Sequence, residues 1–156
     1  MCEAKQSKIL IARTMKTYNI KTYRNGNEII KPHFFILNKG MNSGKPLDIP
    51  CTNCFTFSCS SETDKDFYYW LLFGLWRTKL FHPFLRGTVI PFITLSDLCK
   101  CIQTGTEHAN QDLKRFNKHI EALKFLDLKE KQFHQNLQLI DDTRKMIFYE
   151  YRRRQF

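Results

Sequence analysis

Six cysteines are the residues of this sequence best suited to hold a metal ion. Cys51 and Cys54 have the two-residue spacing of many zinc sites, and Cys99 and Cys101 would supply two more thiolates. Four thiolates make a closed tetrahedral site for a structural zinc ion. The second pair, however, lies at positions i and i+2 of a predicted helix, where side chains do not face the same way. Buried or free thiols are therefore the alternative to zinc for these four cysteines.

A glycine-rich segment at residues 40–45 has the composition of a phosphate-binding loop. The signature of such loops needs four residues between the glycines, and Ser or Thr after the lysine to open a helix. Here there are three residues, and Pro46 follows Lys45, so nucleotide hydrolysis is not predicted. Lys39, Lys45 and Arg86 stay as candidates for contacts with the phosphates of nucleic acid, with an ordinary solvated surface loop as the alternative.

No arrangement of residues typical of catalysis is visible. None of the five histidines has a metal-binding spacing or a nucleophile near it in sequence. We therefore predict that the protein is not an enzyme and has no cofactor apart from the zinc considered above. The net charge of +10 favours polyanionic partners, double-stranded DNA first, while a basic surface that serves solubility is the alternative.

The chain is organised around residues 60–98, where an apolar run at 67–76 follows Ser61, a residue type that caps helices. The run is too short to cross a bilayer, so we predict a core helix wrapped on nearly every side. It should stop near Phe81–His82, ahead of Pro83. An extended piece at 88–93 and a short helix capped by Ser96 and running through Leu98 to Ile102 complete this part.

The N-terminal part has the pattern of strands. Residues 8–13, 17–23, 34–37 and 54–59 are predicted strands, and residues 38–50 form a predicted loop. Asn25-Gly26 between two of them is a strong hairpin signal, which predicts an antiparallel meander. We found no secretory signal, so we expect reduced thiols, a cytoplasmic protein and no membrane association.

The C-terminal third is predicted to be a helical arm. Residues 103–110 are polar and read as a linker, and residues 111–156 show apolar side chains at steps of three and four. The phase slips between Leu126 and Phe133, which predicts a bend or two helices. A helical hairpin packed on its own domain and a helix that pairs with another chain both fit this pattern. The fold class is thus α+β, with a small antiparallel sheet, a buried central helix and a long helical arm; residues 1–102 form its domain.

One segment resembles a known family. The motifs in order are Tyr68, Tyr69, Leu71 and Leu72, then residues 86–93, then Asp97-Leu98, then the helix from Gln111. This order resembles the end of a target-recognition domain in type I restriction–modification specificity subunits. The Pro-rich turn with Glu-Gln that usually precedes the long helix of that family is missing from residues 103–112, and the β-rich part is shorter. No base-contacting residue can therefore be transferred. The whole chain is also similar to small uncharacterised proteins of gut-bacterial mobile elements.

The resemblance and the charge together imply a non-enzymatic DNA-binding or DNA-associated accessory protein, similar to half of a specificity subunit. The alternative is a protein-interaction module of a mobile element that acts through its helical arm. Either reading allows a homodimer or a helical protein partner.

Overall fold

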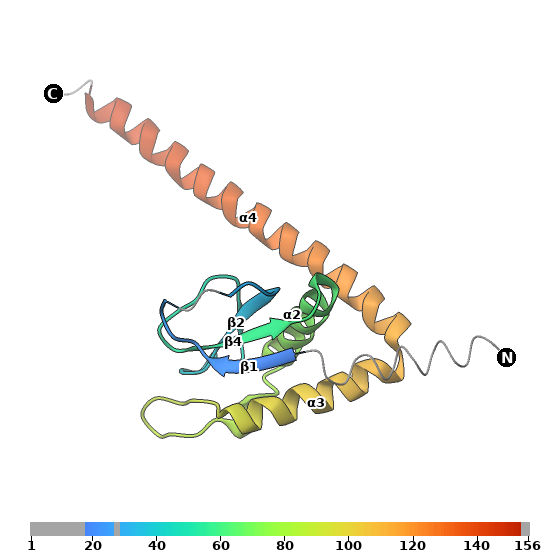
Figure 1. The fold of residues 1–156 in the computed structure, drawn as a ribbon. Helices are drawn as coiled ribbons and strands as arrows, with labels where there is room; N and C mark the ends of the chain where they lie inside the picture. Colours follow the sequence, from blue (N-terminus) through green and yellow to red (C-terminus); the bar gives the residue numbers. More distant parts are fainter. Residues whose placement is uncertain (1–17, 27–28, 154–156) are drawn as a thin grey trace. The chain divides into compact units, whose positions relative to one another are not determined.

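The computed structural model describes residues 18–26 and 29–153 (Figure 1). The sheet contains β1 (Tyr18–Thr22), β2 (His33–Leu37), β3 (Pro46–Leu47) and β4 (Cys54–Cys59). The helices are α2 (Glu62–Arg77), the short 3-10 helix η1 (His82–Phe84), α3 (Leu95–Gln111) and α4 (Leu113–Arg153). This content confirms the α+β prediction, with a small antiparallel sheet and a long last helix. The strand predicted at residues 8–13 lies outside the described residues.

Strand β4 occupies the middle of the sheet, whose order is β1-β4-β2-β3. Phe57 of β4 lies opposite Ile20 of β1 on one side and opposite Phe34 of β2 on the other, both pairings being antiparallel. β1 and β2 therefore run in the same direction and are not neighbours, so the predicted hairpin at Asn25-Gly26 and the predicted meander are wrong. The physical reason is burial: β4 is almost entirely buried, and a central place gives its backbone groups partners on both edges.

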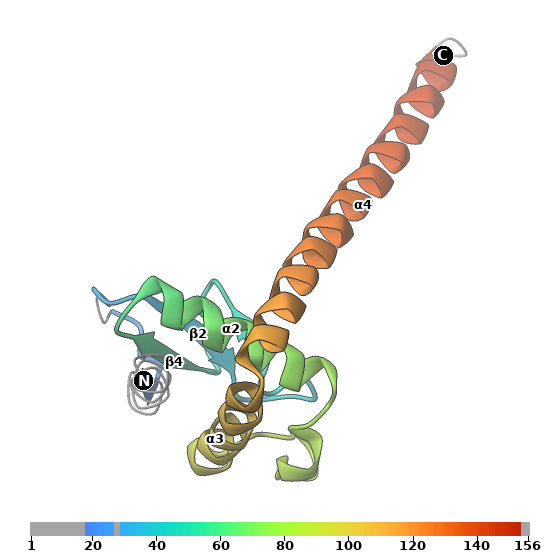
Figure 2. The same cartoon turned by 90° about the vertical axis from the view of Figure 1, so that its right-hand side faces the viewer.

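An aromatic cluster between α2 and the sheet forms the core. The ring of Phe57 stacks on Phe34 at 4.7 Å and on Tyr18 at 4.9 Å, and it lies 5.2 Å from Tyr68 of α2. Leu71 and Leu72 are buried beside Tyr68 on the same helix. Figure 2 shows α2 lying along the sheet. Aromatic rings at these separations interact favourably beyond the area that they bury.

Only one face of α2 is fully buried, and the expectation that it is wrapped on nearly every side is wrong. Three large rings, Trp70, Phe73 and Trp76, are half-buried on another face. The ring centroid of Phe73 lies 5.2 Å from that of Trp70 and 5.8 Å from that of Trp76. The sheet covers one face of the helix and α3 packs beside Leu71 and Leu75, which leaves the side with these three rings only partly covered. The large rings reduce their own exposure by packing against one another.

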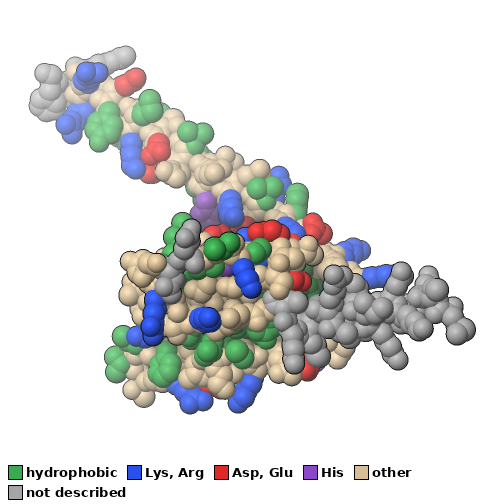
Figure 3. Space-filling model, viewed as in Figure 1, with side chains coloured by type: hydrophobic (Ala, Val, Ile, Leu, Met, Phe, Trp, Pro, Cys, Tyr) green, Lys and Arg blue, Asp and Glu red, His purple; other side chains and the backbone are tan. Residues whose placement is uncertain are grey.

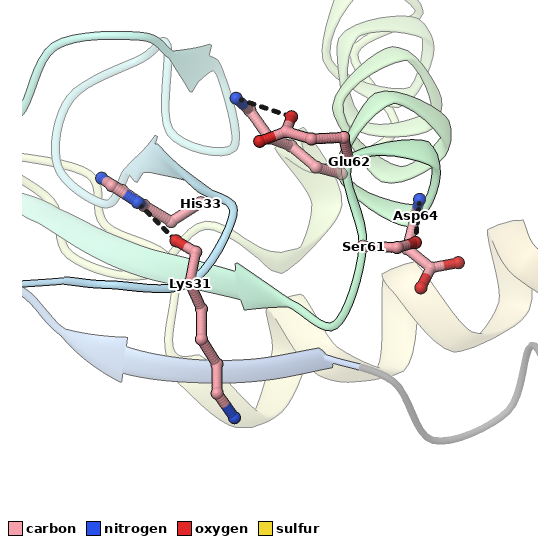
Figure 4. Close-up of polar contacts among 6 residues, drawn as sticks. Lys31, His33, Ser61, Glu62 and Asp64 are labelled. Carbon is pink, nitrogen blue, oxygen red and sulfur yellow. Dashed lines mark hydrogen bonds and ion pairs between the residues drawn. The ribbon is translucent and has the colours of Figure 1, made fainter.

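The ends of α2 are set by local hydrogen bonds. Ser61 accepts a hydrogen bond from the backbone N–H of Asp64 at 3.1 Å, which confirms it as the N-cap (Figure 4). The helix stops at Arg77, earlier than predicted, because Lys79 adopts a positive φ of 58°. The N–H of Leu80 then donates to the carbonyl of Leu75, and that of Lys79 to Trp76, as in a Schellman motif. Pro83 lies beyond this end, in η1.

The segment 38–50, predicted as a loop, is partly ordered by the sheet. Its residues 46–47 form β3, which pairs with β2. Ser43 is fully buried, and its hydroxyl donates to the carbonyl of Gly40 at 2.7 Å. Gly44 is also buried, and its N–H donates to the carbonyl of Leu37. The glycines of this segment therefore hold a defined turn and are not flexible spacers.

The segment 88–93, predicted as an extended piece, belongs to no strand of the sheet. Its residues make a bend, and Phe92 forms isolated bridges to Lys39 and to Arg86. Helix α3 then begins at Leu95 with Thr94 as its N-cap, two residues before the predicted Ser96, because the Thr94 hydroxyl accepts from the N–H of Asp97 at 3.2 Å.

Residues 103–110 lie inside α3 and not in a linker. The Thr106 side chain is buried, and its hydroxyl donates to the carbonyl of Ile102 one turn earlier. The hydroxyl is therefore satisfied within the helix and does not favour a non-helical backbone. Gly105 faces α2, where an added Cβ would lie 3.1 Å from Leu75. Small and hydroxyl-bearing residues thus allow close packing of two helices, although their composition is typical of a loop. The break between α3 and α4 falls at Asp112, whose φ of −143° and ψ of 77° are not helical.

Helix α4 is continuous over 41 residues, so the predicted bend, second helix and hairpin are absent from residues 113–153. Contacts divide the chain into two compact units, residues 1–113 and residues 114–156. Ion pairs between successive turns stabilise α4, such as Lys131 with Asp127 at 2.8 Å. None of the helices in the described residues contains an apolar stretch of the length needed to span a bilayer.

Candidate functional site

The five cysteines in the described residues do not come together as a metal site. The thiol of Cys54 donates to the carbonyl of Cys51 at 2.9 Å. Among residues 18–26 and 29–153, no three His, Cys, Asp or Glu side chains are placed to hold a metal ion, so Cys99 and Cys101 do not complete a site with the first pair. The described cysteines are free thiols.

Burial keeps most of these thiols protonated. It is the main cause that raises the pKa of Cys54, Cys99 and Cys101. Cys59 is 1% exposed, and burial, together with the nearby carboxylate of Asp64, raises its pKa to about 12. A thiol that does not ionise is a poor nucleophile and a poor metal ligand. The arrangement therefore supports a packing role for these side chains.

The three cations predicted to contact phosphate, Lys39, Lys45 and Arg86, are called the basic set below. Lys39 and Arg86 flank Phe92 in a small ladder of backbone bridges. The N–H of Arg86 donates to the carbonyl of Phe92 at 2.9 Å, and the N–H of Phe92 donates back at 2.8 Å. The structure thus brings two members of the basic set together, from segments distant in sequence.

Arg86 is also part of the fold. Its Nη2 lies 2.9 Å from Oδ2 of Asp97, whose carboxylate accepts a hydrogen bond from the Thr94 hydroxyl at 2.7 Å. The hydrogen bond from Thr94 and the charge of Arg86 lower the pKa of Asp97. The Arg86 side chain is still 62% exposed, and a guanidinium has five donors, so it retains donors that face solvent.

Lys45 lies in a different setting. Its ammonium is 5.0 Å from the ring centroid of Trp76, and the guanidinium of Arg77 is 5.4 Å from the same ring. Cations at such distances are attracted to the face of the indole. The structure therefore pairs Lys45 with an aromatic residue that sequence reasoning assigned only to the core.

A second group of cations was missed by sequence reasoning. A surface hollow of about 740 Å³ is lined by Lys21, Tyr23, Arg24 and Lys31, with Thr56 and Ser58 of β4 as part of its wall. His33 Nδ1 lies 2.9 Å from the carbonyl oxygen of Lys31, while the Lys31 ammonium extends away from that contact (Figure 4). No sequence motif marks this group, because the sheet order that gathers its strands is not visible in the sequence.

The most unusual surface is on α4 by itself. Apolar side chains recur along one line of the helix at alternating steps of four and three, with Glu130 and Arg144 as the two charged members. We call this line the α4 seam, and it consists of Leu126, Glu130, Phe133, Leu137, Ile140, Arg144, Ile147 and Tyr151. The apolar members are 48–65% exposed. Figure 3 shows hydrophobic side chains between charged ones along this helix.

These features define a small α+β protein with a basic surface and a long helix whose exposed seam has coiled-coil spacing. The model of a family of unknown function, DUF6943, matches residues 20–150, and the chain belongs to that family. No curated protein matches the chain. No solved structure matches it either, so the comparisons give no link to specificity subunits.

Proposed function

We propose that the chain is a non-enzymatic interaction protein that assembles through α4. The observation that carries this proposal is the exposure of the α4 seam, whose apolar residues leave at least 48% of their surface in water. An exposed, mostly apolar line of this kind is characteristic of a partner-binding helix. Burying one Leu, Ile or Phe side chain fully contributes about 1.5–3 kcal/mol, so the five such side chains of the seam supply ample driving force for association.

The spacing of the seam indicates the shape of the partner. Steps of four and three repeat every seven residues, which is the pattern that interlocks with a second helix. The partner surface is therefore a helix with its own apolar line, as expected for a protein-interaction module of a mobile element.

A photo-crosslinking amino acid tests this proposal in the native host. Placed at Ile140, on the seam, it should form a crosslink to protein; placed at Gln138, which is also exposed, it should not. Equal crosslinking from both positions, or none from either, would contradict a role for the seam. The mass of the crosslinked product also separates a second copy of the chain from another protein.

DNA association is a second candidate, favoured by the net charge of +10 and by the cations at the hollow and in the basic set. In this proposal the protein acts as a DNA-associated accessory, similar to half of a restriction–modification specificity subunit. Lys39, Lys45 and Arg86 contact phosphates of double-stranded DNA, and α4 recruits the partner.

Fluorescence anisotropy with duplex DNA across a salt series tests this second candidate. We expect affinity to fall steeply as salt rises, because each phosphate contact releases counterions. Reversal of two charges, Lys39→Glu with Lys45→Glu, should reduce the slope of log affinity against log salt by about 2, one for each lost contact.

The matched control reverses Lys131 and Lys145 on α4, which changes the net charge equally. It should bind DNA more tightly than the variant of the basic set. A flat salt response of the unmodified protein would exclude DNA binding of this kind.

A further inference from the structure

We infer that the helix that covers the α4 seam is α4 of a second copy of this chain, in antiparallel orientation. The inference rests on the proposed function, since it names the partner of the same seam. It is carried by the positions of the charged residues in and beside the seam, which suit one orientation and conflict with the other.

The charged members of the seam exclude a parallel, in-register pair. In that arrangement each seam residue faces its own counterpart. Glu130 would then lie against Glu130 and Arg144 against Arg144, in the interior of the pair. Like charges in contact away from water destabilise association, and neither layer would contain an opposite charge.

An antiparallel pair removes both conflicts. With Leu137 facing Ile140 of the second copy, the helix geometry fixes the other layers, which are Phe133 with Arg144, Glu130 with Ile147 and Leu126 with Tyr151. Each charged seam residue then faces an apolar one. Arg144 can lie over the ring of Phe133, a favourable arrangement for a guanidinium. Glu130 is one layer from Arg144 of the second copy, about 4.5 Å along the axis, so opposite charges meet at both ends by symmetry.

The residues that flank the seam also favour the antiparallel orientation. In an antiparallel pair, a residue just before a seam position approaches a residue just before a seam position of the other helix, and residues just after seam positions approach one another in the same way. Lys129 therefore meets Glu150 of the second copy, and this contact joins opposite charges. His134 meets Asp141, whose carboxylate is already paired with Lys145 of its own helix at 2.6 Å. In the parallel register Lys129 meets His134 instead, and no opposite charges are joined. Charge complementarity thus selects a second copy in the antiparallel orientation.

Charge swaps at Lys129 and Glu150 test this inference with the full chain. The two residues are about 31 Å apart within one helix, at 1.5 Å per residue, so they cannot interact inside one chain. Lys129→Glu and Glu150→Lys should each weaken self-association about fivefold, measured by sedimentation equilibrium, because each creates two like-charge contacts. The double variant restores opposite charges and should return to within about twofold of the unmodified chain.

Lys131→Glu is the matched control, since it makes the same change of charge off the seam. It should alter self-association less than about twofold. Lys131→Glu also removes the ion pair with Asp127, a surface pair that contributes little to stability. Glu and Lys have similar helix propensity, so the helical circular dichroism signal should change little in every variant.

The outcomes are distinguishable. Two single variants whose effects add in the double variant would overturn the antiparallel register. An unmodified chain that stays monomeric over the whole concentration range would overturn pairing with a second copy. The proposed function would still stand in that case if Ile140 crosslinks to another protein in the host, and it would fall if Ile140 gives no specific crosslink.

Discussion

Replacement of Gly44 by alanine is expected to lower the free energy of unfolding by about 2–5 kcal/mol. Gly44 has φ +93°, a conformation that costs an L residue about 1–2 kcal/mol. An added Cβ would also lie 2.7 Å from Cγ and 2.6 Å from Cε2 of Phe81, whose ring is 1% exposed. The ring cannot move without opening the core beside η1, so a cost of overpacking adds to the cost of strain.

Gly40 is the matched control for this prediction. It has the same φ of +93°, but nothing lies within 4 Å of the position that a Cβ would take. Gly40→Ala should therefore lose only the strain, about 1–2 kcal/mol. Urea denaturation followed by circular dichroism measures both variants. Equal losses for the two glycines would show that the contact with Phe81 does not contribute.

Replacement of Leu137 by aspartate is expected to weaken self-association about a thousandfold, or about 4 kcal/mol. Leu137 lies at the centre of the α4 seam, where it faces Ile140 of the second copy in the proposed pair. A symmetric pair loses two leucines and gains two buried carboxylates without partners. Sedimentation velocity over a range of concentrations measures the shift from pair to single chain.

Leu139 provides a close control, because it is also a leucine of α4, with 66% of its surface exposed against 64% for Leu137. It lies off the seam. Leu139→Asp should therefore leave association nearly unchanged, although it removes the same apolar group and adds the same charge. If both variants dissociate the pair equally, general hydrophobicity and not the seam holds it together.

The features that the sequence determined are local. The cap at Ser61 and the helix after it follow from hydrogen bonds between residues three apart and from a run of apolar side chains. The helical nature of residues 113–153 follows from a periodicity that is contained in the segment itself. The α+β class and the central helix were predictable for the same reason, since each depends on interactions between near neighbours in the chain.

The tertiary structure alone decided the rest. The order of the sheet depends on which strand gains most from two neighbours, and the Asn25-Gly26 turn does not encode that choice. Residues 103–110 are helical because packing against α2 outweighs a composition typical of loops. Arg86 is drawn to Asp97, and Lys45 to Trp76, by partners distant in sequence. These outcomes share one cause: the free energy of long-range burial and pairing exceeds the weak preferences of single residues.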